Sequence, residues 1–329
     1  MYSNDTSMSN RSPIPDFIVI DIWNRKKVRM RLKRDKRKKY NLKASIHTVS
    51  VKSDKILEEI PAEVDKCIVT SSRNKDGNIV TSSIINTNKL CGDLFTYDEF
   101  LTALDTILVN AGIDEYEFIR ADLRLDSYDE SHYKEFAKLN RYLISALAVT
   151  YRVYNCYRTL DLFSNDQLSV AIKNRYFECE NYDKQVESRG TDFAASRFEL
   201  RSKQIGTHDL KKVFMANWFL RLDKSLKNLE AVQNRYNDEL LKIYNEDVDK
   251  FPRQFRNITD FVMKYQHCIF THKQMVDLLQ RMGVTNAENR VNSYKKKYGI
   301  DFYSPADVRY AVKEIKRAIT EFFENSATN

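Results

Sequence analysis

The five cysteines of this 329-residue chain form no Cys-x-x-Cys pair, and its five histidines form no His-x-His or His-x-x-x-His pair. Zinc knuckles depend on such pairs, and the scattered cysteines do not indicate a disulfide framework, so free thiols in a reducing compartment are expected. A metal centre built from histidines is also disfavoured.

Long apolar runs are absent as well. No stretch approaches the roughly 20 residues that a membrane-spanning helix needs, and the first 16 residues lack the basic-then-apolar order of a secretion signal. We therefore expect a cytoplasmic protein without membrane contact. The chain is long enough for one large domain plus a smaller one, or for two of moderate size, and its 42% apolar and 12% aromatic residues can build their cores.

The positive charge is concentrated near the N-terminus. Between Arg25 and Lys43 stand twelve Lys or Arg residues and one Asp, a net +11 in a chain whose formal charge is +8. Such a run binds polyanions by releasing counterions, so it predicts contact with DNA; a solvated tail or an RNA-binding arm are the alternatives. The residues expected to contact DNA here are Arg25, Lys26, Lys27, Arg29, Arg31, Lys33, Arg34, Lys36, Arg37, Lys38 and Lys39.

Hydrophobic periodicity predicts an α+β fold: a mostly antiparallel central sheet with flanking helices, followed by a helical C-terminal region. The expected units are a flexible basic arm at 1–43, an α+β domain at 44–206 and a helical region at 207–329. Strands are predicted at 46–51, 67–71, 78–85, 117–127, 158–163, 168–173, 176–182 and 196–202. Helices are predicted at 95–111, 130–149, 210–222, 226–244 and 258–269.

Near the C-terminus, residues 271–282, Gly283 and residues 286–298 have the lengths and the glycine turn of a helix-turn-helix. Its second segment is rich in basic residues, namely Arg290, Lys295, Lys296 and Lys297. This pattern indicates a DNA-binding element, with ordinary helix packing as the alternative.

Two predicted strands alternate charged and apolar residues, which places their charges on one face of the sheet. In the first strand, Ile119, Ala121, Leu123 and Leu125 are expected to point inward, and Arg120, Asp122, Arg124 and Asp126 outward. In the second, Phe198 and Leu200 point inward, and Arg197, Glu199 and Arg201 outward.

These charges, with the intervening Tyr182, suit a particular chemistry. Carboxylates on neighbouring strands can hold a hard divalent cation, arginines can hold phosphate, and a tyrosine can act as a nucleophile. The alternatives are a packing role for Tyr182 and cross-strand pairing of Asp122 and Glu199 with Arg124 or Arg201.

The order of segments over about 80–205 resembles the Rep_trans family of rolling-circle plasmid replication initiators and related relaxases of conjugative elements. The matching segments are Asn86-Thr-Asn-Lys, a helix from Phe95, Arg120-Ala-Asp-Leu-Arg-Leu-Asp126, Asn181-Tyr-Asp-Lys184 and Arg197-Phe-Glu199. The family usually has Gly-x-Arg nine residues before its tyrosine, whereas this chain has Ala171-Ile-Lys173, which retains a positive charge for DNA contact.

The resemblance implies a metal-dependent DNA nicking-joining endonuclease that starts rolling-circle replication. Tyr182 would form a 5′-phosphotyrosine link at a plasmid origin. Mg²⁺ or Mn²⁺ would be held by Asp122 and Glu199, with Asp126 as a further ligand; Lys184, Arg197 and Arg201 would support catalysis. Four residues of strand separate Asp122 and Asp126 by about 13 Å, which favours Asp122.

The expected partners are origin DNA, as supercoiled duplex and single strand, with a host helicase and a second copy of the chain as further candidates. The alternative function is a non-catalytic DNA-binding replication or regulatory protein.

Overall fold

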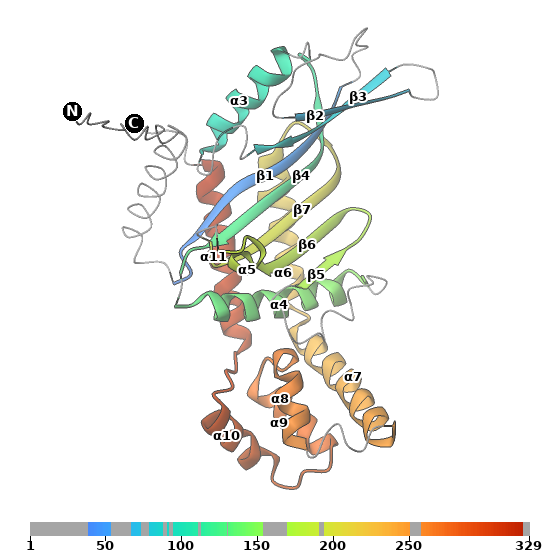
Figure 1. Ribbon diagram of the computed structural model, residues 1–329, viewed down its shortest axis with the longest axis vertical. Coiled ribbons are helices and arrows are strands. Elements are labelled where there is room, and N and C mark those ends of the chain that lie inside the picture. Colours follow the sequence, from blue (N-terminus) through green and yellow to red (C-terminus); the bar gives the residue numbers. More distant parts are fainter. Residues whose placement is uncertain are drawn as a thin grey trace, which may run out of the picture.

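The computed structural model describes residues 39–53, 67–73, 79–87, 91, 95–110, 113–129, 131–153, 170–190, 194–250 and 258–324. Its centre is a seven-stranded sheet with the strand order β2-β3-β1-β4-β7-β6-β5, in which every neighbouring pair is antiparallel (Figure 1). The strands are β1 (Leu42–Ser53), β2 (Cys67–Arg73), β3 (Ile79–Asn86), β4 (Glu117–Ser127), β5 (Val170–Lys173), β6 (Phe177–Asp183) and β7 (Ser196–Thr207).

Helices surround this sheet and form most of the C-terminal region, so the α+β prediction is confirmed. They are α3 (Tyr97–Asn110), α4 (Tyr133–Thr150), α5 (Lys184–Glu187), η2 (Lys212–Trp218), α6 (Phe219–Leu226), α7 (Leu229–Lys250), α8 (Ile258–Tyr265), η3 (Gln266–Cys268), α9 (His272–Arg281), α10 (Ala287–Tyr298) and α11 (Pro305–Glu324). η2 is a π-helix that opens the segment predicted as one helix from residue 210. The predicted strand at 158–163 lies outside the described residues.

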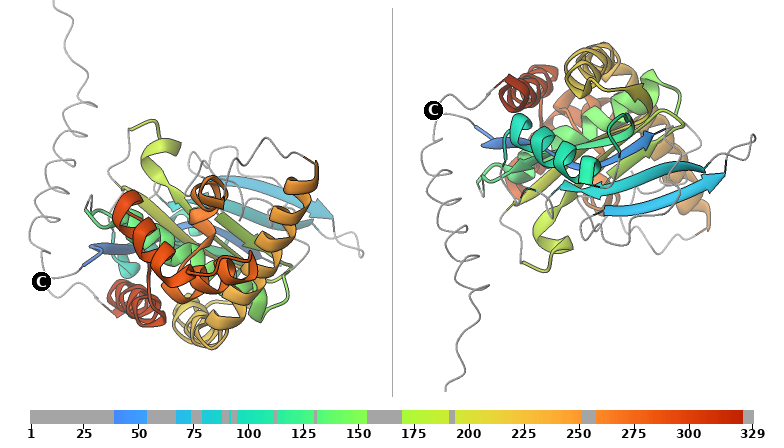
Figure 2. Two further views of the ribbon diagram at one scale, coloured as in Figure 1. Left: turned by 90° about the horizontal axis from the view of Figure 1, so that it is seen from below. Right: turned by 90° about the horizontal axis from the view of Figure 1, so that it is seen from above.

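One face of the sheet is covered by helices. α4 contacts β5, β6 and β7, whereas α11 contacts β1 and β4. Viewed from above, α11 and α6 lie beside each other on the same side of the sheet (Figure 2). The apolar side chains predicted to point inward, such as Leu123, Leu125, Phe198 and Leu200, are fully buried in this core. The charged side chains of the same strands therefore project from the opposite face.

The inward residue at the start of β4 differs from the prediction. Phe118 is fully buried, while Ile119 is partly exposed. The pairing register of β4 shifts between Phe118 and Arg120 against both β7 and β1, so Ile119 is the extra residue of a bulge. This extra residue reverses the alternation, and Phe118 takes the inward place expected for Ile119.

The helix α11 was not predicted, although its sequence carries clear signals. Ser304 and Asp307 form a reciprocal cap, in which each backbone N–H donates to the side chain of the other residue, at 2.7 and 3.3 Å. Val308, Val312, Ile315 and other residues at helical spacing are buried. Through α11, the C-terminal region returns to the sheet and contacts β1, α3, α4 and α6.

The turn between α9 and α10 requires glycine. Gly283 has φ +81°, and the next backbone N–H, of Val284, donates to the carbonyl of Leu279 at 3.0 Å, which closes the end of α9. An added Cβ would meet no atom within 4 Å, so the cost of a substitution is the left-handed backbone alone. We expect Gly283→Ala to lower the free energy of unfolding by about 1–2 kcal/mol.

Urea unfolding checks this value. The adjacent exposed position provides the control, because Thr285→Ala should change the unfolding free energy by less than about 0.5 kcal/mol. Equal midpoints for the wild type and Gly283→Ala would show that the turn does not constrain this glycine.

Candidate active site

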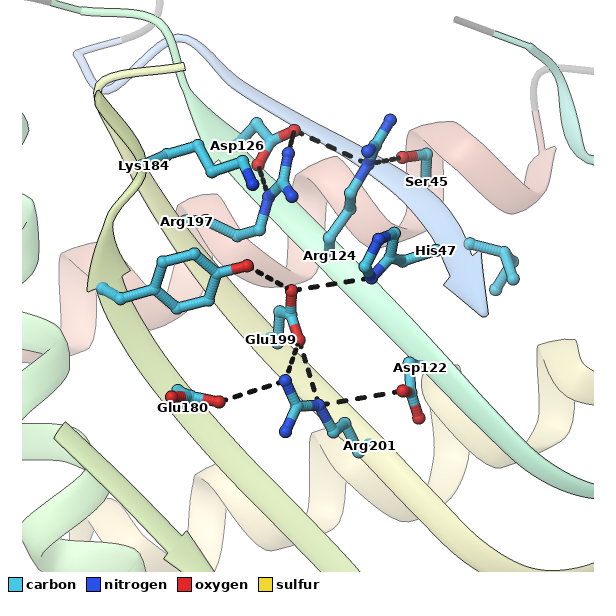
Figure 3. Close-up of polar contacts among 12 residues, drawn as sticks. Ser45, His47, Asp122, Arg124, Asp126, Glu180, Lys184, Arg197, Glu199 and Arg201 are labelled. Atoms are coloured by element: carbon cyan, nitrogen blue, oxygen red, sulfur yellow. Dashed lines mark hydrogen bonds and ion pairs between the residues drawn. The ribbon is translucent and has the colours of Figure 1, made fainter. Parts of the chain in front are cut away.

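The predicted catalytic and metal-binding residues lie on the face of the sheet opposite the helices, across β4, β7 and β6, and Lys184 follows at the start of α5. The antiparallel register pairs Asp122 with Arg201, Asp126 with Arg197, and Tyr182 with Arg197. Because side chains two residues apart share a face, these residues and Glu199 project together. Figure 3 shows Glu199 between His47 on one side and Arg201 on the other, with the helices behind the strands.

Tyr182 and Glu199 form the central contact. The Tyr182 hydroxyl donates a hydrogen bond of 2.7 Å to Oε1 of Glu199. Burial and the neighbouring Glu199 carboxylate raise the pKa of Tyr182 well above its ordinary value, and Arg197 opposes this only in part. The phenol is therefore protonated at neutral pH, and its proton points at a carboxylate oxygen.

Glu199 is the ionised partner of that proton. Its side chain is only 1% exposed, and burial alone would raise the pKa of Glu199. The charge of Arg201, the Tyr182 hydrogen bond and the nearby His47 instead hold this pKa below its ordinary value. Glu199 is accordingly a carboxylate at neutral pH, which is the form a general base needs.

His47 belongs to the site, although its sequence context did not identify it. Its Nδ1 lies 3.7 Å from Oε1 of Glu199, and its side chain is 28% exposed. Burial lowers the pKa of His47; Glu199 opposes this, while Arg124 and Arg197 reinforce it, so the ring is neutral at pH 7.

This histidine lies at a bulge of β1, where the β1–β4 register shifts between Ile46 and Thr48. It follows the buried Ile46 and stands two residues after Ser45, which contacts Arg124 on the charged face, so ordinary alternation places His47 on that face. Its place next to an inward-pointing residue of a predicted strand is the signal that could have singled out His47.

Arg201 is the hub of an acidic cluster. Its guanidinium lies 2.6 Å from Glu178, 3.0 Å from Glu180 and 3.7 Å from Asp122, and it also contacts Glu199. Burial would lower the pKa of Arg201, but the surrounding carboxylates, Glu199 foremost, raise it above its ordinary value. The predicted catalytic role of Arg201 thus coincides with a structural one, because it neutralises several acids.

Asp126 and Arg197 form a separate buried pair. The guanidinium donates twice to the carboxylate, at 2.6 and 3.0 Å, and both residues are 3% exposed. Arg124 stands 3.6 Å from the same carboxylate and donates to Ser45 at 2.7 Å. Burial would raise the pKa of Asp126, but Arg197 and Arg124 lower it below its ordinary value.

Lys184 lies close to the ring of Tyr182. Its Nζ is 5.8 Å from the centroid of the Tyr182 ring and forms an ion pair with Glu187. Together with Arg197 and Arg201, Lys184 therefore surrounds the phenol with positive charge that is already matched by acidic partners.

The predicted metal ligands do not assemble as one set. Among the residues that the structure describes, no group of three His, Cys, Asp or Glu side chains could hold a metal ion. Asp126 accepts its hydrogen bonds from Arg197, and both oxygens of Asp122 accept from Arg120, at 2.9 and 2.7 Å. Asp122 is therefore paired with an arginine of its own strand, and Asp126 with an arginine of the neighbouring strand.

His47 and Glu199 form a pair with suitable donor atoms, in which Glu199 also accepts from Tyr182 and Arg201. Mg²⁺ and Mn²⁺ favour oxygen ligands, and Mg²⁺ usually keeps several waters and binds through one or two carboxylates plus substrate phosphate. One carboxylate and one neutral imidazole fit a cation of that partly hydrated kind.

Most of the predicted DNA-contacting residues, from Arg25 to Lys38, lie outside the described residues. Lys39 forms a 2.6 Å ion pair with Glu135, and Lys173 is exposed at the end of β5. β1 begins at Leu42, so the last residues of the basic segment belong to the sheet.

No family model, curated protein or solved structure matches this chain. In the part of the chain that the structure describes, no helix is long and apolar enough to cross a membrane.

Proposed function

We propose that the protein is a tyrosine-dependent DNA nicking-joining enzyme that initiates rolling-circle replication, with Tyr182 as its nucleophile. The hydrogen bond from Tyr182 to Glu199 carries this proposal, because it joins a nucleophile to an ionised base at 2.7 Å. The substrate, a plasmid origin, is inferred from the resemblance to the Rep_trans initiators. The related relaxases of conjugative elements would carry out the same nicking reaction.

The proposed chemistry balances as a transesterification. Glu199 takes the phenolic proton as the Tyr182 oxygen attacks phosphorus; the new O–P bond forms while the P–O3′ bond breaks, and the leaving 3′ oxygen takes up a proton. Because the pKa of Tyr182 is raised, a free phenolate is disfavoured, and proton transfer must accompany the attack. A positioned base contributes about 10²–10⁴-fold to such a step.

The charge around Glu199 favours a cation in this reaction. Glu178, Glu180, Glu199 and Asp122 gather around Arg201, and Arg120 and Lys203 pair with two of these acids, so the acids offset the positive charge that an incoming phosphate would meet. A divalent cation bound by His47 and Glu199 would supply positive charge to polarise that phosphate.

The test uses the full chain with supercoiled DNA carrying its native replicon, with and without Mg²⁺ or Mn²⁺. We expect open circles whose 5′ end carries protein and whose 3′ hydroxyl is extended by a polymerase. Intact supercoils across a tiled library of that replicon would overturn the proposal.

One observation favours a second candidate, a non-catalytic DNA-binding replication or regulatory protein. Asp122, Asp126 and Glu199 each pair with an arginine, as in a purely structural network. This candidate predicts DNA binding that falls steeply with salt and is indifferent to divalent metal and to Tyr182.

Loss of His47 should weaken the response to metal more than it weakens the fold. For His47→Ala, we expect the Mn²⁺ concentration at half-maximal nicking to rise on the order of 10–100-fold, as when a metal site loses a supporting group. A metal titration of nicking rates measures this. The control is His208→Ala, at an exposed histidine that directly follows the end of β7. An identical response of both variants would remove His47 from the metal site.

A further inference from the structure

The helix α10 exposes most of its surface. Of its twelve residues only Ala287, Val291 and Tyr294 are buried, and these form one narrow stripe along the helix. The polar residues on its remaining sides give this helix a large surface that is open to solvent or to a partner. In Figure 1, α10 lies at the end of the molecule remote from the sheet.

The exposed face opposite that stripe carries side chains that can read bases. At helical spacing i, i+3, i+4 and i+7 stand Asn289, Asn292, Ser293 and Lys296, and all four are exposed. Asparagine pairs in a bidentate manner with adenine, lysine with guanine, and serine with either. Asn292 already contacts His272 of α9, with 3.3 Å between Oδ1 and Nε2, a contact on the exposed surface.

Basic residues flank this face. Arg290 and Lys297 lie along one border, and each stacks on a tyrosine of the same helix, at 6.0 Å from the Tyr294 ring and 5.0 Å from the Tyr298 ring. With Lys295 and Lys296 against Glu288, the helix carries a net charge of +3. Basic residues at the edges of a helix can contact the phosphates on either side of a DNA groove.

The neighbouring helix supports this geometry. α9 packs against α10, and the left-handed Gly283 makes the turn between them, as in a helix-turn-helix. α9 is fixed from behind, because Met275, Leu278 and Leu279 are buried and the Thr271 side chain caps its first turn. The turn thus presents α10 outward from a rigid support.

We propose that α10 enters the major groove of duplex DNA and reads its sequence through Asn289, Asn292, Ser293 and Lys296. A helix of twelve residues is about 18 Å long, and the major groove of B-form DNA, about 12 Å wide, admits such a helix. The deep, narrow major groove of double-stranded RNA does not. This inference goes beyond the proposed nicking activity and does not depend on it.

The test selects bound sequences from a library of random duplexes with the full chain. We expect one enriched motif, which the triple variant Asn289→Ala, Asn292→Ala, Lys296→Ala no longer enriches. Affinity of this variant for the enriched duplex should fall at least tenfold, since each bidentate contact discriminates by about that factor. Its affinity for random duplex should change much less.

A matched control is available on α7, where Asn234, Lys242 and Asn245 are likewise exposed. The triple alanine variant at these positions should enrich the same motif as the wild type. Arg290→Ala and Lys297→Ala should each weaken binding to all duplexes and reduce the salt dependence by about one counterion.

Three results would overturn the inference: no enriched motif, an unchanged motif in the α10 triple variant, or binding of acidic proteins but not duplex DNA through the same residues. A motif that depends on α10 in a protein that leaves supercoils intact would support the inference while refuting the nicking proposal.

Discussion

Tyr182→Phe is expected to abolish covalent nicking. The substitution removes the only atom of this side chain that can bond to phosphorus, and it leaves the ring in place. Because Glu199 keeps its contact with Arg201, its charge remains neutralised, and the loss of one hydrogen bond should cost about 1–3 kcal/mol of stability at most. The variant should therefore fold and bind DNA but form no protein–DNA link.

The measurement is the yield of 5′-linked protein on supercoiled origin DNA, with urea unfolding as a check on folding. Tyr176→Phe is the matched control, because Tyr176 is 55% exposed and immediately precedes β6, the strand that carries Tyr182. It should nick at the wild-type rate. Nicking by Tyr182→Phe at more than about a hundredth of that rate would assign the nucleophile elsewhere or exclude covalent catalysis, since removing a nucleophile costs far more.

The strands of the sheet followed from the sequence because their alternation is strong. β4 and β7 combine apolar residues with charged ones at period two, and this pattern also placed Asp122 and Glu199 on one surface. Alternation fails where a bulge adds a residue, and for this reason the inward position of Phe118 was not predicted. Bulges are fixed by pairing between distant strands, which the local sequence does not encode.

The sequence also could not predict which arginine pairs with each carboxylate. Arg120, Arg124, Arg197 and Arg201 alternate with the acids, so several pairings satisfy the same pattern. The register selects among them: Asp126 stands opposite Arg197 and takes it as a bidentate partner, which removes Asp126 from the predicted ligand set. α11 is a different case, because its capping residues and its apolar spacing are local features. They are visible in the sequence, and this helix could have been predicted from them.

The charged face of the sheet is a buried network rather than a solvated surface. Asp122, Arg124, Asp126, Arg197 and Glu199 are each at most 3% exposed. Isolated charges would be very costly there, so each must have a partner of opposite sign. This requirement makes the network stabilising only as a whole, and it couples the stability of the fold to the same groups that surround Tyr182.

Removal of one partner should therefore destabilise the protein strongly. Arg197→Met leaves the Asp126 carboxylate buried without its bidentate donor, and we expect the free energy of unfolding to fall by about 3–5 kcal/mol. The double variant Asp126→Asn, Arg197→Met removes both charges and should recover most of that loss. The exposed pair of Arg281 and Asp238 provides the control, since Arg281→Met should cost less than about 1 kcal/mol.

The pH dependence of the unfolding free energy tests whether Asp126 is the group that stabilises this network. Because the pKa of Asp126 is lower in the folded protein than in the unfolded chain, its pairing stabilises the fold above about pH 4, the ordinary aspartate value, and this contribution is lost as the pH falls through the folded pKa. Urea unfolding of the wild type and the double variant between pH 2 and 7 should therefore show a shallower acid loss in the double variant. Equal losses for the two proteins, or a double variant no more stable than Arg197→Met, would show that this pair does not hold the charged face together.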